Sequence, residues 1–247
     1  YGGMALATRP FRRDFRWIAS ASFGREEART SDTAGISHGD LTLVELAAGM
    51  QYERKRFRLD GAAGLAAPFG VDANPWPEAK VVAQYKPVHH LELTGTGGYK
   101  GRLPSLRERF DTAAGDPSLG PEKVAHAEVR ATEKLDERLH VEVAPFYRYS
   151  TGTIKQTMGK FANTGTLDIY GFDLIARGRV HRRVELGVGY QNVRAISDRS
   201  ETPLDFLPRH RGDVWGQVML QRGASALVRA KYIGTAPVKM YLESRAR

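Results

Sequence analysis

Apolar and polar side chains alternate one by one along most of the chain. In the stretch 139–149, Val141 and Val143 are apolar, whereas the intervening His140 and Glu142 are polar. A period of two residues indicates a β-strand with one apolar and one polar face. The same alternation is found at residues 15–24, 44–53, 125–131 and 183–191, and it is weaker around Val214 and Leu227. The chain is therefore predicted to be all-β.

Most of the predicted strands are long enough to cross a membrane. We expect twelve, at residues 1–9, 14–27, 40–53, 56–69, 78–86, 89–101, 122–134, 137–151, 165–178, 182–196, 209–221 and 224–236. Strands of soluble proteins usually have about five to six residues. A tilted strand needs about 9–11 residues to cross a bilayer. Strand length therefore favours a transmembrane β-barrel.

The connections between the predicted strands are alternately short and long. Short ones lie near residues 10–13, 54–55, 87–88, 135–136, 179–181 and 222–223, and long ones near 28–39, 70–77, 102–121, 152–164 and 197–208. This alternation places all the long loops at one end of an antiparallel up-and-down sheet, as in outer-membrane barrels. A sandwich with Greek-key connections does not require it.

Aromatic residues gather near both ends of the predicted strands. Tyr99, Tyr149, Tyr190 and Tyr232 lie near the long-loop ends, and Tyr52, Phe57 and Tyr85 lie near the short-turn ends. Two aromatic girdles are typical of a barrel that spans a bilayer. Because tyrosine is common in any β-sheet, this observation supports the barrel only together with strand length and the order of the connections.

The polar face of the predicted strands carries many ionised side chains. They include Glu45, Glu53, Asp60, Glu92, Glu128, Arg130, Glu142, Arg148, Asp173, Arg177, Arg183, Glu185 and Arg229. An Arg or Lys that faces lipid at the bilayer centre costs about 2–4 kcal/mol. We therefore expect the apolar face to meet lipid and the polar face to line an enclosed interior that is wet or packed against polar groups.

The composition excludes several classes of site. The chain has no cysteine, which excludes disulfides, thiolate zinc sites and cysteine nucleophiles. No stretch approaches the ~18 consecutive apolar residues that suggest a membrane helix. We predict no catalytic residues, no metal site and no cofactor, and we expect His89 and His90 to be ordinary residues of a short turn.

Positive charge is concentrated in the predicted short turns. The formal net charge is +9, and the turns RPFRRDFR at 9–16, ERKR at 53–56 and RVHRR at 179–183 explain much of it. Because this charge is distributed over turns, contact with anionic lipid head groups is favoured over binding of nucleic acid. We therefore predict outer-membrane lipids as partners and no nucleic acid.

The longest connection and the strands after it carry the motifs of a known family. YKGRLPSLRERF…GDPSLGPEKVAHAEV resembles a segment of TonB-dependent outer-membrane receptors, through Tyr99, Lys100, Pro104, Ser105, Leu106, Glu108, Phe110, Leu119, Pro121, Glu122 and Glu128. Four further pieces resemble the same family: NTGTLDIYGFDLIA with Asn163, Gly165, Gly171, Phe172 and Asp173, VGYQNVRA, PLDFLPRHRGDVW with Leu204, Pro208, Arg209 and His210, and AKYIGT. These pieces follow in the family's order over roughly residues 85–236, whereas residues 1–80 match only as generic barrel strands.

The resemblance implies a fold, a location and a function. The family's barrel has about 22 strands around a plug. Residues 1–247 are thus expected to be a partial barrel domain of about twelve strands, without the plug and the last strands. The implied function is TonB-dependent uptake of a scarce nutrient, such as a ferric siderophore or cobalamin, across the outer membrane of a Gram-negative bacterium. The implied partners are this ligand and, through a plug not in this chain, the TonB energy-transducing complex. No enzymatic reaction is implied.

The loop at 102–121 is the candidate ligand-binding segment. Arg102, Arg107 and Arg109 are the candidate contacts to an anionic chelate, since Arg presents a planar fork of donors to carboxylates. Alternatively, these arginines contact lipopolysaccharide or keep the loop solvated. Two other functions stay open: a small passive porin-like channel, which an even number of strands permits, and an outer-membrane barrel enzyme, which no spacing of residues supports.

Overall fold

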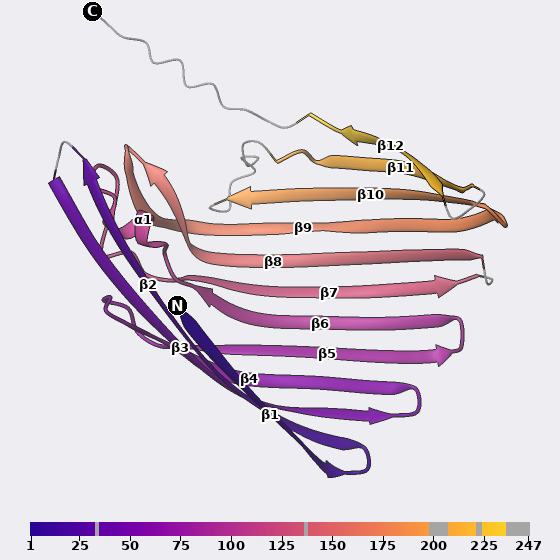
Figure 1. Cartoon of the computed structure of the whole chain (residues 1–247), viewed down its shortest axis with the longest axis horizontal. Helices are drawn as coiled ribbons and strands as arrows, with labels where there is room; N and C mark the ends of the chain where they lie inside the picture. The colour runs from indigo at the N-terminus through magenta and orange to yellow at the C-terminus, as the bar shows by residue number, and fades with distance from the viewer. Residues whose placement is uncertain (33–34, 136–137, 198–206, 221–223, 236–247) are drawn as a thin grey trace, which may run out of the picture.

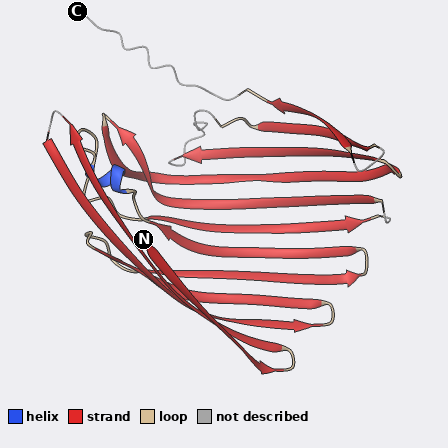
Figure 2. Ribbon diagram, in the orientation of Figure 1, coloured by secondary structure: helices blue, strands red, loops and turns tan. Residues whose placement is uncertain are grey.

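The strands form one continuous up-and-down sheet. The computed structural model describes residues 1–32, 35–135, 138–197, 207–220 and 224–235. These residues form twelve antiparallel strands, each paired with its neighbours in sequence (Figures 1 and 2). The strands are β1 (Gly2–Arg12), β2 (Phe15–Asp32), β3 (Gly35–Arg54), β4 (Phe57–Phe69), β5 (Trp76–Val88), β6 (Leu91–Arg102), β7 (Glu122–Lys134), β8 (Leu139–Thr157), β9 (Lys160–His181), β10 (Val184–Ser197), β11 (His210–Met219) and β12 (Ser225–Ile233). The helix α1 (Leu106–Phe110) follows β6. No helix in the described part of the chain is long and apolar enough to span a membrane.

The prediction of twelve strands in up-and-down order is confirmed, but two of the predicted loops are wholly or largely wrong. Residues 152–164 are not a loop, because β8 and β9 continue through this segment to a tight turn at Met158 and Gly159. Both turn residues have positive φ, 50° and 84°, as a two-residue type I′ hairpin requires. The strands β8 and β9 therefore form a tall hairpin.

A second tall hairpin replaces most of another predicted loop. β2 extends to Asp32 and β3 begins at Gly35, so the prediction of a loop over 28–39 is also wrong for most of its length. Residues 70–75 and 103–121 connect β4 to β5 and β6 to β7. They lie within the predicted loops at 70–77 and 102–121. Of the predicted loop at 197–208, residues 198–206 lie outside the described residues.

Pairing across the sheet separates the side chains onto two faces. Directly paired residues share a face: Leu46 pairs with Leu65, whereas the adjacent Glu45 pairs with Ser22. Leu46 and Leu65 are 57% and 58% exposed, and no second layer of described strands covers their face (Figure 1). For the described residues this excludes a two-layer sandwich and agrees with the expected apolar outer face.

Hydrogen bonds and ion pairs connect the side chains of the polar face. Arg130 contacts Glu142 at 2.6 Å and Glu128 at 2.9 Å, and the Ser22 hydroxyl donates to Glu45 at 2.8 Å. The Arg130–Glu142 and Ser22–Glu45 contacts join neighbouring strands, β7 to β8 and β2 to β3, whereas Arg130 and Glu128 both belong to β7. The charged residues that the alternation assigned to one face are thus brought together there.

The short turns form a row along one edge of the sheet. Backbone N–H groups connect successive turns: Glu53 to the carbonyl of Asp14 at 2.9 Å, Lys86 to Arg56 at 2.8 Å, Lys134 to His90 at 2.8 Å, Arg179 to Arg138 at 2.9 Å and Met219 to Arg183 at 2.7 Å. We call this edge the short-turn rim and the opposite edge the long-loop rim. In the described sheet, β1 and β12 each pair with one strand only, so the sheet is not closed.

Candidate ligand-binding loop at the long-loop rim

The connection between β6 and β7, residues 103–121, is ordered around the short helix α1. The Ser105 hydroxyl accepts the backbone N–H of Glu108 at 3.2 Å, and the Glu108 carboxylate accepts the backbone N–H of Ser105 at 2.6 Å. This reciprocal pair is a capping box, which satisfies two backbone donors at the start of a helix. α1 ends at Phe110, after which the Asp111 side chain accepts the backbone N–H of Ala114 at 2.8 Å.

Arg109 lies inside this loop and not on its surface. Only 1% of Arg109 is exposed, and its guanidinium donates to the carbonyl of Pro117 at 2.7 Å and to the carbonyl of Leu119. Burial lowers the pKa of Arg109, and the carboxylates of Asp72 and Asp116 partly offset this effect. The side chain therefore folds the second half of the loop back onto α1.

Arg102 connects the two ends of the loop. Its guanidinium contacts Glu122 at 2.6 Å and Glu108 at 3.1 Å, so it links the end of β6 to the start of β7 and to α1. Glu122 also accepts the backbone N–H of Ile154 in β8. Burial raises the pKa of Glu108, but hydrogen bonds from Arg102 and Ser105 outweigh it and hold this pKa below its usual value.

Arg107 projects away from the loop. Its side chain is 82% exposed, and its nearest carboxylate, Asp111, is 3.9 Å away. Among the three candidate ligand-binding arginines, Arg102 and Arg109 thus have partners within the loop, whereas Arg107 leaves its donors accessible. The sequence places the three residues in one segment, but the structure does not bring their guanidinium groups together. Their contact with a ligand stays a prediction.

Residues 103–121 bridge the two tall hairpins. On one side α1 contacts β2 and β3, and on the other side the N–H of Phe161 in β9 donates to the carbonyl of Ala114 at 2.8 Å. The Asn163 side chain accepts the N–H of Gly120 at 2.7 Å and donates to the carbonyls of Gly120 and Gly152 at 3.1 and 2.8 Å. In Figure 1, α1 accordingly lies between the β2–β3 and β8–β9 hairpins.

Most of the buried apolar residues of the described chain lie in or beside this loop. They include Leu41, Ala66, Trp76, Leu106, Ala114 and Leu119. The Trp76 indole lies against Gly101, where an added Cβ would be 2.1 Å from its nitrogen, and this nitrogen donates to Glu78 at 3.1 Å. A packed core at this rim gives the loop a fixed shape, which sequence alternation alone does not reveal.

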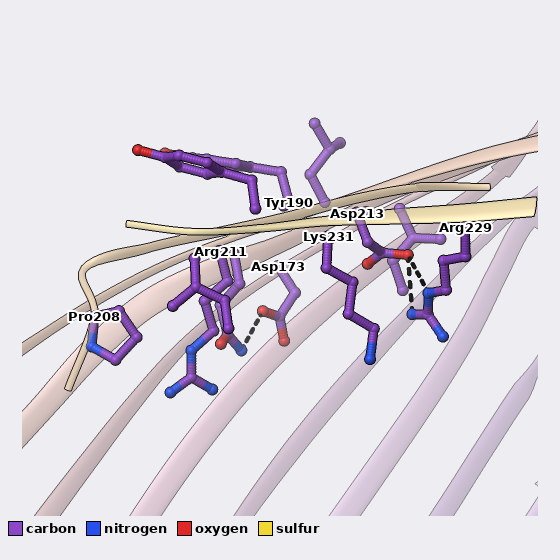
Figure 3. A pocket seen from close by; sticks show the side chains of 14 residues that line it. Asp173, Tyr190, Pro208, Arg211, Asp213, Arg229 and Lys231 are labelled. Atoms are coloured by element: carbon purple, nitrogen blue, oxygen red, sulfur yellow. Dashed lines mark hydrogen bonds and ion pairs between the residues drawn. The ribbon is translucent and has the colours of Figure 1, made fainter. Parts of the chain in front are cut away.

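A second polar region lies on β9 to β12. Residues of these four strands line a concavity of about 670 Å³. Figure 3 shows that the side chains of Asp173, Arg211 and Lys231 lie on one side of the strands and that of Tyr190 on the other. The Gln191 amide donates to Asp173 at 2.8 Å. Among the described residues, the lining cations Arg211, Arg229 and Lys231 outnumber the carboxylates Asp173 and Asp213 by one, and of these cations only Arg229 forms an ion pair, with Asp213. No group of three His, Asp or Glu residues suited to a metal ion occurs among the described residues.

A protein-family model that matches most of the sequence identifies the family of this chain. The model of the family described as TonB-dependent receptor-like, β-barrel, matches residues 19–241. This chain belongs to that family. Its twelve antiparallel up-and-down strands, described above, are thus those of a TonB-dependent receptor barrel. No curated protein sequence matches this receptor barrel.

Solved structures share the fold of this receptor barrel. The copper transporter OprC is 15% identical with a TM-score of 0.76, and the ferric-catecholate import receptor Fiu from E. coli K12 is 15% identical with a TM-score of 0.70. The siderophore receptor PirA from Pseudomonas aeruginosa is 10% identical with a TM-score of 0.78. These matches cover 93–94% of this chain but only 42–44% of the other chains. The chain therefore spans less than half the length of these structures.

The motif residues of this receptor barrel have structural tasks that the sequence did not reveal. Ser105 and Glu108 cap α1, and Leu106 and Leu119 are buried beside it. Asn163 holds the loop against the β8–β9 hairpin, 43 residues from its partner Gly120. The Ser-x-x-Glu spacing was an available signal for the helix, whereas no local pattern could pair Asn163 with the loop.

Proposed function

We propose that this chain forms part of the wall of an outer-membrane receptor for TonB-dependent uptake of a scarce nutrient, such as a ferric siderophore or cobalamin. The family match over residues 19–241 carries the proposal. The uncovered apolar face and the charged opposite face support a position in a bilayer. The names of similar structures, which are copper, ferric-catecholate and siderophore transporters or receptors, support a nutrient of this class.

The proposed receptor is larger than the described sheet. Two observations support a barrel with more strands: β1 and β12 each have one partner in the described sheet, and the similar chains are more than twice as long as the part matched. In such a receptor the ligand enters from outside, and a plug within the barrel interacts with the TonB complex. This chain then supplies wall and exterior surface, and energy coupling acts through the plug.

Residues 103–121 are the proposed ligand-facing surface within this wall. The accessible donors of Arg107, 82% exposed, suit a direct contact with the carboxylate or phenolate oxygens of an anionic chelate. Arg102 and Arg109 support that contact by holding the loop in shape through Glu108 and the carbonyl of Pro117. The loop thus presents a charged group on a preorganised support, which lowers the entropy lost on binding.

Chemical labelling in intact cells tests the orientation of the wall. Because the chain has no cysteine, Arg107→Cys and His89→Cys each give one thiol, at the long-loop and the short-turn rim respectively. With the chain exported to the outer membrane, a membrane-impermeant maleimide should label Arg107→Cys in intact cells and His89→Cys only after permeabilisation. Equal labelling of both in intact cells would contradict the proposal.

Liposome swelling separates the receptor wall from a passive channel. The purified chain in liposomes should give no flux of small solutes, because the described sheet is not closed around a pore. Steady flux of small sugars without any partner would favour the small porin-like channel instead.

A further inference from the structure

The short-turn rim carries a concentration of cations with few counter-ions. Its segments 9–16, 53–58 and 177–183 contain twelve of the chain's 37 lysine and arginine residues and only two carboxylates, Asp14 and Glu53. The formal net charge of the whole chain is +9. These segments therefore hold about a third of the cations but only two of the 28 carboxylates, so the excess of positive over negative charge lies at one end of the strands.

Two of these cationic turns lie side by side. The backbone N–H of Glu53 donates to the carbonyl of Asp14 at 2.9 Å, which places the β1–β2 turn beside the β3–β4 turn. In the next turn, the N–H of Lys86 donates to the carbonyl of Arg56 at 2.8 Å. The cations of the β1–β2 and β3–β4 turns are thus brought together at the short-turn rim.

An aromatic row borders these turns on the apolar face. Phe15 and Tyr52 have ring centroids 4.8 Å apart, and Tyr52 and Phe57 have centroids 6.1 Å apart. Phe57 pairs with Tyr85 across β4 and β5. Trp17, on the same face, is 49% exposed. Aromatic rings in this position are typical of the boundary between hydrocarbon and head groups.

Several cations lie directly beyond these rings. Arg54 pairs with Phe57 and Arg9 with Trp17, so both lie on the apolar face, and the Arg12 guanidinium lies 5.5 Å from the centre of the Phe11 ring. We call Arg9, Arg12, Arg13, Arg54 and Lys55 together with Phe15, Trp17, Tyr52 and Phe57 the basic–aromatic collar. In the described residues none of its five cations has a carboxylate partner, whereas Arg58, which shares the polar face with Asp60, contacts it at 2.8 Å.

We propose that the basic–aromatic collar binds the phosphate groups of anionic phospholipids in the leaflet beside the short-turn rim. This inference rests on the proposed function, because it needs a barrel in a bilayer. Arg donates planar pairs of hydrogen bonds to phosphate, and the adjacent rings meet the upper acyl chains. An anionic partner without hydrocarbon, such as nucleic acid, would leave the exposed rings of Trp17 and Phe57 in water.

Lipid quenching of tryptophan fluorescence tests the collar, because Trp17 belongs to it. The chain is reconstituted in phosphatidylcholine vesicles with increasing phosphatidylglycerol, and one lipid at a time carries brominated acyl chains. Trp17→Phe identifies the signal of the collar. Each cation that contacts a head group contributes about fivefold to lipid preference. The triple variant Arg12→Gln, Arg13→Gln, Arg54→Gln should therefore lower the preference for phosphatidylglycerol at least fivefold. The matched variant Lys123→Gln, Lys160→Gln, Arg194→Gln, at the long-loop rim, should keep it.

The outcomes separate this inference from the proposed function. Quenching by brominated phosphatidylcholine alone reports insertion, so its absence would count against the membrane wall itself. If the chain inserts but shows equal preference for both lipids, or if the two triple variants behave alike, the collar is not an anionic-lipid site. Loss of the preference in 0.5 M NaCl provides a check on the unmodified chain, since salt screens exposed charges.

Discussion

The side chain of Asn163 holds both backbone groups of Gly120: it accepts the N–H at 2.7 Å and donates to the carbonyl at 3.1 Å. These bonds join the 103–121 loop to β9. Asn163→Asp keeps the acceptor but loses the donor and brings a carboxylate against two carbonyls. We expect the loop to lose about 1–3 kcal/mol of local stability. Hydrogen exchange of the Gly120 amide should be faster by the corresponding factor, with the amide of Val129 in β7 unchanged as a control.

Two arginines in one helical turn should respond differently to the same substitution. Arg109→Ala leaves the carbonyls of Pro117 and Leu119 without donors, so the loop should lose about 2–4 kcal/mol. Arg107→Ala removes an exposed side chain and should change stability by less than about 0.5 kcal/mol. Limited proteolysis of the chain folded in detergent micelles should show rapid cleavage within 103–121 for Arg109→Ala alone. Equal protection of both variants would show that the buried guanidinium does not organise the loop.

The loop should loosen in acid. Glu108 has a pKa below its usual value because, despite burial, it accepts hydrogen bonds from Arg102 and Ser105. Its contribution is therefore complete above the unfolded pKa of about 4.3 and is lost as the pH falls through the lower folded pKa. Hydrogen exchange in 103–121, corrected for intrinsic rates, should rise below about pH 4.3.

Glu108→Gln supplies the control for this pH dependence. It should loosen the loop at neutral pH and flatten the acid response. A smaller response should persist, because backbone N–H groups hold the pKa of Asp111 low, and the hydroxyl and N–H of Ser118 hold that of Asp116 low. An unchanged acid response in Glu108→Gln would assign the effect to these two aspartates.

The strands and their faces were predictable because each obeys a local rule. Alternation over a long strand fixes which residues share a face, and pairing of sequential strands then carries the same assignment across the sheet, as Leu46 and Leu65 show. The β8–β9 hairpin was missed, since the Gly, Thr and Asn residues of 152–164 indicate a loop and Met158 is an unusual residue at positive φ. The hairpin extends this far because residues of the two strands pair with each other, as Thr153 does with Thr164.

The internal order of the loop was only partly predictable. The Ser105–Glu108 spacing indicates a helix start, but five residues are too few for a periodic pattern. Burial of Arg109 depends on carbonyl groups eight and ten residues away, and no sequence period reports such contacts. Three similar arginines therefore looked equivalent in sequence, although the surrounding backbone gives them different environments.

The turn of the tall β8–β9 hairpin can be improved. Met158 has φ of 50° and is fully exposed, so its side chain contributes nothing that offsets the unfavourable backbone conformation. Asn tolerates this region and precedes Gly in the preferred two-residue turn. Met158→Asn should raise the stability of the hairpin by about 0.5–1 kcal/mol, measured by hydrogen exchange of Thr157 and Lys160. Met158→Val, a β-branched residue, should lower it and serves as the opposing control.

Adjacent residues on opposite faces provide the test of which face meets lipid. Leu46 is 57% exposed on the apolar face, and Ala47 points to the polar face next to it. In a bilayer, Leu46→Arg should cost about 2–4 kcal/mol near the midplane, whereas Ala47→Arg gains a polar surrounding and should cost much less. The fraction of chain that folds into vesicles, followed by heat-dependent migration in gels, measures the difference. Because both variants add the same charge to the same strand, a greater loss for Ala47→Arg would mean that the polar face is the one in contact with lipid.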